Sequence, residues 1–149
     1  MAAFEGVDYY ALDGLLSDEQ KLVRDTVREF VSDKILPVID EHQREGTFPV
    51  EALPGMAAMG LLGANLEGYG LPGLDNISYG LILQELERGD SGLRSFVSVQ
   101  GALCMYPIWR YGSEAQKQQW LPAMGRGDVI ACFGLTEPDA GSDPGAMRT

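Results

Sequence analysis

The most informative stretch of the chain is Ala131-Cys132-Phe133-Gly134-Leu135-Thr136-Glu137-Pro138-Asp139-Ala140-Gly141-Ser142-Asp143. The apolar run from Val129 to Leu135 predicts a buried strand. Proline, glycine, serine and acidic residues follow it and predict a turn. A loop at the end of a rigid strand presents backbone N–H groups and hydroxyls, and this suits a bulky ligand with many hydrogen-bonding groups.

The residues that precede this stretch predict helices. Ser17 and Ser113 are candidate N-caps, because Gln20 and Gln116 stand at their capping-box positions. The apolar residues of 22–35 follow helical spacing. Further helices are expected over residues 50–60, 77–88, 91–110 and 113–122. Residues 63–76 are rich in glycine and predict an ordered loop. The predicted fold class is an all-α N-terminal helical bundle followed by the start of a β domain.

Three segments are expected along the chain. Residues 1–15 form a leader, residues 16–126 the helical domain, and residues 127–149 the start of the β domain. The first eight residues contain no basic region and no arginine-rich amphipathic stretch, so neither a secretory signal nor a transit peptide is expected. The expected compartment is the bacterial cytoplasm, or the mitochondrial matrix for a processed eukaryotic protein.

Composition excludes several classes of protein. The 149 residues are 45% hydrophobic and 22% charged, as in soluble globular chains, and no apolar run approaches the ~20 residues that a membrane helix needs. The net charge of −11 makes nucleic acid an unexpected partner.

Cysteine and histidine provide no metal site. Cys104 and Cys132 lie in apolar surroundings without metal-ligand spacing, so we expect two buried free thiols. His42 is the only histidine, which leaves little basis for a histidine-based catalytic triad or a metal cluster.

The loop after the predicted strand resembles a known signature. Thr136-Glu137-Pro138, two further residues and Gly141-Ser142-Asp143 resemble the flavin-binding motif of the acyl-CoA dehydrogenases. Upstream stretches resemble one branch of that family, the glutaryl-CoA dehydrogenases; they are 84–95, 98–100, 107–108, 111–114 and 121–122. The resemblance covers the chain from about Leu16 to Thr149, which would be that protein's N-terminal helical domain and the start of its middle β domain.

The resemblance implies an FAD-dependent oxidation of an acyl-CoA thioester. In the family, a carboxylate base removes an α-proton while a hydride passes from the β-carbon to the flavin. The glutaryl branch then releases CO2 to give crotonyl-CoA, although some close relatives stop before decarboxylation. Electrons pass to an electron-transfer flavoprotein, and the usual assembly is a homotetramer. Two alternatives stay open: an acyl-CoA dehydrogenase with a neutral substrate, and a helical interaction module that has lost catalysis.

The resemblance also assigns residues to the flavin. They are Phe133, Gly134, Leu135, Thr136, Glu137, Pro138, Gly141 and Ser142. Thr136 would bond the isoalloxazine ring, and Gly141-Ser142 would approach the pyrophosphate and the pantetheine arm. The simpler interpretation is an ordinary turn after a strand. For Glu137 we expect a role in ordering the loop rather than in proton transfer.

The substrate residues implied by the resemblance are Arg94, Ser95, Glu87 and Ser142. If Ser91 caps the fourth helix, Arg94 lies in the first turn, where a cation opposes the helix dipole. The ω-carboxylate of a glutaryl group would relieve that conflict and accept charge-assisted hydrogen bonds. Glu87 could orient Arg94. The alternative is a surface arginine paired with Asp90 or Glu87.

No catalytic residue is expected in this chain. The family's base is a glutamate of the C-terminal helical domain, and no residue here matches it. The flavin-contacting Trp-x-Thr strand is also unmatched, because Trp109 and Trp120 both fall in predicted helices. Tyr69 and Trp109 are expected to pack in the core. We therefore expect the 149-residue chain alone to be inactive.

Overall fold

A computed structural model describes residues 9–149. Residues 1–8 of the expected leader lie outside the described residues, and the three predicted segment boundaries stay predictions. Within the leader, a 3-10 helix spans Leu12–Leu15. Asp13 in this helix forms ion pairs with Arg24 and Lys21. These pairs hold the 3-10 turn against the first long helix. The apolar side chains of the turn, Leu12 and Leu15, remain exposed.

Helix α1 spans Asp18–Phe30 and begins at the predicted capping box. The backbone N–H of Gln20 donates to Ser17 Oγ at 3.2 Å, and the backbone N–H of Ser17 donates to Gln20 Oε1 at 3.0 Å. A π-helical turn, Val31–Ile35, continues the helix up to the bend at Pro37. Helix α2, Ile39–Glu45, follows and ends at Gly46, which adopts a left-handed φ of 64°.

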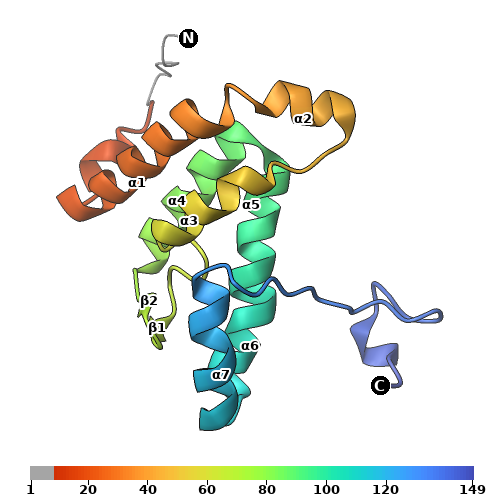
Figure 1. The fold of residues 1–149 in the computed structure, drawn as a ribbon. Coiled ribbons are helices and arrows are strands. Elements are labelled where there is room, and N and C mark those ends of the chain that lie inside the picture. The colour runs from red at the N-terminus through yellow and green to blue at the C-terminus, as the bar shows by residue number, and fades with distance from the viewer. Residues whose placement is uncertain (1–8) are drawn as a thin grey trace.

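The remaining helices lie close to the predicted ranges. They are α3 (Leu53–Ala58, after a 3-10 turn at Val50–Ala52), α4 (Asn76–Gly89), α5 (Ser91–Ser98), α6 (Tyr106–Tyr111) and α7 (Glu114–Gly125). A π-helical segment, Val99–Met105, joins α5 to α6, so the three form one rod (Figure 1). The described residues thus confirm the predicted helical bundle.

The glycine-rich loop contains a small hairpin that was not predicted. Strand β1, Glu67–Gly68, pairs antiparallel with β2, Leu71–Pro72. Tyr69 and Gly70 between them both have positive φ, of 56° and 79°, as a type I′ turn requires. Strands of two residues are too short to produce a visible alternation of apolar and polar side chains.

The core consists of two clusters of buried side chains. The first lies between α1, α4 and α5, where Val31, Ile82 and Leu93 are fully buried. The second lies under the hairpin and between the π-helical segment and α7, and includes Met105 and Leu121. Within residues 9–149, the helices bury their apolar side chains mainly against one another, because no large sheet covers them.

The predicted strand over residues 129–135 is wrong for this structure. The segment is extended but belongs to no sheet, and Ile130, Phe133 and Leu135 are 44–48% exposed. A strand requires a hydrogen-bonded neighbour, and no described segment pairs with this one. Figure 1 shows it leaving the helices and ending in a separate turn. The apolar residues of this segment indicate a tendency to form a strand, but they do not indicate which segment would pair with it.

The two thiols differ, contrary to the expectation that both are buried. Cys104 is buried in the second cluster, and burial raises the pKa of its thiol. Cys132 is exposed, because it lies on the extended segment.

The helices described for residues 9–149 include none with the length and apolar character that a transmembrane span requires.

Candidate functional site

The loop after the extended segment is organised by the carboxylate of Glu137. This carboxylate accepts hydrogen bonds from the backbone N–H groups of Arg148, at 2.9 Å, and Thr149, at 3.1 Å. The Thr149 hydroxyl also donates to it. These bonds lower the pKa of Glu137, with the Thr149 hydroxyl as the largest cause. Glu137 therefore holds residues 148–149 against the loop, and the roles predicted for it beside the flavin stay predictions.

The other residues predicted to contact the flavin remain accessible. Phe133, Gly134, Leu135, Thr136, Pro138 and Ser142 are exposed, whereas Gly141 is half-buried. A Cβ atom built at Gly134 would meet nothing within 4 Å, and one built at Gly141 would meet only Thr136 Cγ2, at 3.6 Å. The backbone N–H groups of residues 132–136 donate no hydrogen bond to the described residues.

These features fit a flat, polar-edged ring system such as isoalloxazine. Exposed Phe133 and Leu135 offer apolar surface, and the neighbouring backbone N–H groups offer donors to carbonyl and ring-nitrogen acceptors. The glycines leave room for a ligand to approach the backbone. The individual flavin contacts of these residues stay predictions.

Arg94 lies near the start of α5 and pairs with Glu87, as the alternative of a surface ion pair expected, with side chains that are 37% and 47% exposed. The substrate role of Arg94 stays a prediction. The Nε of Arg94 donates to Glu87 Oε2 at 2.7 Å, and the Ser91 hydroxyl donates to Glu87 Oε1 at 2.5 Å. The Arg94 bond, followed by the Ser91 bond, lowers the pKa of Glu87. Among the described residues, no partner occupies the two terminal nitrogens of the guanidinium. Arg94 can therefore keep its bond to Glu87 and still donate to an anion.

The cap of α5 is Asp90 rather than Ser91. The Asp90 side chain accepts a hydrogen bond from the backbone N–H of Leu93 at 2.8 Å. Ser91 is the first residue of the helix, and its hydroxyl bonds to Glu87 instead. The predicted proximity of Arg94 to the helix start holds, because the cap moves by only one residue. Ser95 follows Arg94 and is half-buried.

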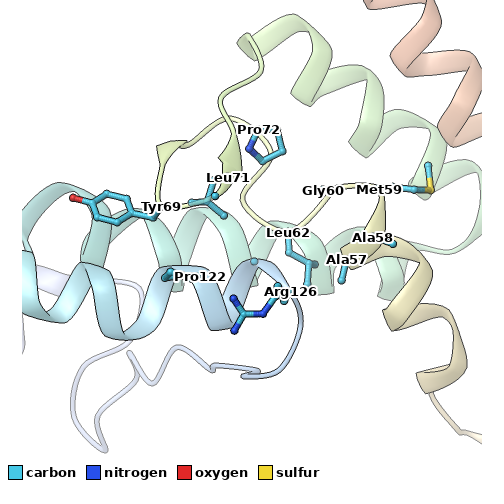
Figure 2. A pocket seen from close by; sticks show the side chains of 12 residues that line it. Ala57, Ala58, Met59, Gly60, Leu62, Tyr69, Leu71, Pro72, Pro122 and Arg126 are labelled. Carbon is cyan, nitrogen blue, oxygen red and sulfur yellow. The ribbon is translucent and has the colours of Figure 1, made fainter.

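The structure does not bring the flavin loop and Arg94 together. Residues 137–149 stand clear of α5 in Figure 1, and no hydrogen bond or ion pair joins the two regions. A cavity of about 500 Å³ lies between α3, the hairpin and α7 (Figure 2), but its lining includes none of the predicted site residues. The predicted substrate role of Ser142, which lies on the loop, likewise stays a prediction.

Two buried polar residues near these regions were not identified from the sequence. Glu85 is 1% exposed and bonds both Arg28 and Arg88. Gln100 is also 1% exposed, and its amide bonds the start of the extended segment. The one available signal was a polar residue on the apolar face of a helix. The part of the chain that the structure covers contains no group of three or more side chains able to hold a metal ion.

Comparison with known proteins identifies the class to which this helical chain belongs. A family model described as "Acyl-CoA dehydrogenase, N-terminal domain" matches residues 17–128. The chain belongs to the acyl-CoA dehydrogenase family, as its motifs predicted.

Among individual relatives, a solved glutaryl-CoA dehydrogenase from Mycobacterium smegmatis in complex with FADH2 is 49% identical, with a TM-score of 0.90; the match covers 94% of this chain and 36% of that one. The rat mitochondrial short-chain specific acyl-CoA dehydrogenase is 36% identical over 135 residues, which are 90% of this chain and 33% of the rat protein. A chain in a structure of the electron transferring flavoprotein of Acidaminococcus fermentans is 31% identical, with a TM-score of 0.83; the match covers 95% of this chain and 36% of that one. This chain therefore spans about a third of the length of the relatives that it matches.

Proposed function

We propose that this chain is the N-terminal part of an FAD-dependent glutaryl-CoA dehydrogenase, which oxidises glutaryl-CoA and releases CO2 to give crotonyl-CoA. The observation that carries the proposal is the orientation of Arg94 by Glu87, which leaves two guanidinium nitrogens for an anion. Among solved structures, the identity to the Mycobacterium smegmatis glutaryl-CoA dehydrogenase, 49%, exceeds the 34% to a butyryl-CoA dehydrogenase from Megasphaera elsdenii, which supports the same branch.

The chain would contribute binding and orientation to this reaction. Arg94 would pair with the ω-carboxylate of the substrate, assisted by Ser95, and so fix the acyl chain along its length. Phe133 to Ser142 would hold FAD, which, when bound, supplies the acceptor for the hydride from the β-carbon. The net charge of −11 opposes an anionic substrate at long range, so local donors such as Arg94 must provide the attraction.

The same proposal extends to partners. We infer an electron-transfer flavoprotein as the electron acceptor, supported by the match to the Acidaminococcus fermentans structure. A homotetramer and a location in a bacterial cytoplasm or a mitochondrial matrix belong to the proposal as consequences of the family resemblance.

The test is the substitution Arg94→Met in the full-length product of the gene, compared with Arg94→Lys. Charge-assisted hydrogen bonds contribute about 1.5–3 kcal/mol, so Arg94→Met should lower kcat/KM for glutaryl-CoA by about 10- to 100-fold. Arg94→Lys should retain part of the activity, because it keeps the charge but loses the planar donors. Turnover of butyryl-CoA, which has no ω-carboxylate, should change less than threefold.

Three outcomes distinguish the alternatives. An equal loss for glutaryl-CoA and butyryl-CoA would reject the dicarboxylate assignment. Oxidation of glutaryl-CoA without release of CO2 would indicate a non-decarboxylating relative. A full-length protein that cannot be reconstituted with FAD would favour an interaction module without catalysis.

A further inference from the structure

The side-chain amide of Gln100 joins the helical rod that carries Arg94 to the extended segment that precedes the predicted flavin loop. It is 1% exposed and belongs to the π-helical segment Val99–Met105. Its Nε2 donates to the backbone oxygen of Val129 at 2.8 Å and to that of Met124 at 3.3 Å. Its Oε1 accepts from the backbone N–H of Ala131 at 3.0 Å. One side chain therefore occupies the positions that a neighbouring strand would otherwise fill.

This arrangement requires an amide. The Val129 oxygen needs a donor and the Ala131 N–H needs an acceptor, and glutamine is the side chain of this length that offers both without charge. The third partner, the Met124 oxygen, also accepts from the backbone N–H of Gly127 at 3.1 Å. The network fixes which end of the amide is nitrogen and which is oxygen. Displacing the segment would leave the Val129 oxygen and the Ala131 N–H without partners, so the amide holds these two groups in one register.

The position of Gln100 links the acyl end to the flavin end. Arg94 lies six residues earlier on the same rod, which is about 9 Å along a helix. Phe133 lies two residues after Ala131, about 7 Å along an extended chain. The side chains of Val129 and Ala131 also pack on the second core cluster, so the contact combines hydrogen bonding with apolar burial.

We infer that Gln100 is a positioning residue: its amide sets the register of residues 129–135 against the Arg94 helix, and through it the separation between the flavin and the anion-binding arginine. The inference rests on the proposed function for the identity of the two ends. The register itself rests on the three hydrogen bonds and not on any ligand.

The experiment uses the full-length product of the gene and three variants. Gln100→Met keeps the approximate shape and removes all three hydrogen bonds. Gln100→Glu keeps the acceptor for Ala131 but cannot donate to Val129 while it is ionised. Leu121→Ala is the matched control, because it weakens packing in the same cluster and leaves the amide in place.

Two quantities are measured. The first is hydrogen exchange of the peptide that covers residues 129–135, before FAD is added and relative to peptides of α7. We expect it to quicken at least tenfold in Gln100→Met, by an intermediate factor in Gln100→Glu and by less than threefold in Leu121→Ala. The second is the Kd for FAD, which should rise in the same order, by at least tenfold for Gln100→Met.

The outcomes separate this inference from the proposed function. Unchanged relative exchange in both Gln100 variants would overturn the positioning role, even if FAD binding and turnover are as proposed. If Gln100→Met does not fold, Gln100→Glu decides by the same comparison. A wild-type protein that takes no FAD would overturn the proposed function, and the exchange measurement would still decide whether Gln100 holds the segment.

Discussion

The Nη2 atom of Arg28 lies 2.7 Å from Oε1 of Glu85, and this contact joins α1 to α4 through a carboxylate that is 1% exposed. Arg88 donates to the other oxygen at 3.0 Å from within α4. Two arginines therefore surround one buried negative charge. The contact links residues 57 positions apart and lies where α1 packs against α4.

The first prediction concerns this buried carboxylate. The double substitution Arg28→Met and Arg88→Met should lower the free energy of unfolding by about 3–5 kcal/mol, because it leaves a buried charge without a partner. Adding Glu85→Met should restore much of the loss, since the unpaired charge is then removed. Urea denaturation of the three proteins measures both changes. A triple variant less stable than the double variant would contradict the argument.

The second prediction separates the true cap of α5 from its neighbour. Asp90→Ala should destabilise the protein by about 1 kcal/mol, because the backbone N–H of Leu93 loses its acceptor. Ser91→Ala should cost less than about 0.5 kcal/mol, because Ser91 is an exposed first-turn residue. Thermal unfolding followed by circular dichroism gives both values. Equal losses of stability in the two variants would contradict the assignment of Asp90 as the N-cap of α5.

The third prediction compares two helical glycines. Gly80 lies exposed in α4, and an added Cβ would meet nothing within 4 Å, so Gly80→Ala should stabilise by about 0.4–1 kcal/mol. At Gly101, an added Cβ would lie 3.3 Å from the backbone nitrogen of Gly63. Because backbone cannot move aside as a side chain can, Gly101→Ala should destabilise by about 1–3 kcal/mol. Midpoints of urea unfolding that shift in the same direction would contradict this contrast.

The fourth prediction concerns the partner of Arg94. In the full-length product of the gene, Glu87→Gln should raise KM for glutaryl-CoA about two- to fivefold, because the guanidinium loses an exposed charged partner that orients it. KM for butyryl-CoA should not change. Ser91→Ala, which removes only the hydroxyl bond to Glu87, serves as the control and should have a smaller effect.

The pH dependence of that pair follows from the lowered pKa of Glu87. A lowered pKa means that the stabilisation is fully present above the usual value of about 4.3 and is lost as the pH falls through the lower folded value. The Arg94–Glu87 pair should therefore be intact throughout a KM profile from pH 6 to 8. A glutaryl-specific rise of KM within that range, absent in Glu87→Gln, would contradict the assignment.

The fifth prediction is that the 149-residue chain alone does not oxidise glutaryl-CoA. Its predicted flavin residues are exposed and lie apart from Arg94, and none of its carboxylates is assigned as the base that removes the α-proton. Dye reduction by the purified chain, supplied with FAD and glutaryl-CoA, is the measurement. Turnover above that of free FAD would refute it.

Local sequence predicted the helices well because their signals are short-range. The capping boxes at Ser17 and Ser113 each involve a partner three residues later, and both are present in the structure. The motif of residues 136–143 could also be recognised from the sequence, because its residues are nearly contiguous. The same reasoning placed the cap of α5 one residue late, since aspartate and serine are both good caps and stand side by side.

Longer-range features were beyond such reasoning. The ion pair between Arg28 and Glu85 joins residues 57 positions apart, and no periodicity encodes that pairing. The same holds for the bonds of Gln100, which reach residues up to 31 positions away. The strand at 129–135 was mispredicted for the related reason that hydrophobicity does not specify a neighbour. The burial of Cys132 was mispredicted for the same reason, because it was inferred from the apolar residues around it in the sequence.

The helices, most of their starts, the family and the pairing of Arg94 with Glu87 could be predicted from the amino-acid sequence, because capping, helical periodicity, the signature and that pair depend on residues near one another. The buried polar groups that hold the helices together, and the place of residues 129–135, became visible in the folded chain alone. Those outcomes depend on distant groups finding hydrogen-bond partners in space, and a buried group left without a partner costs more than any local preference can offset.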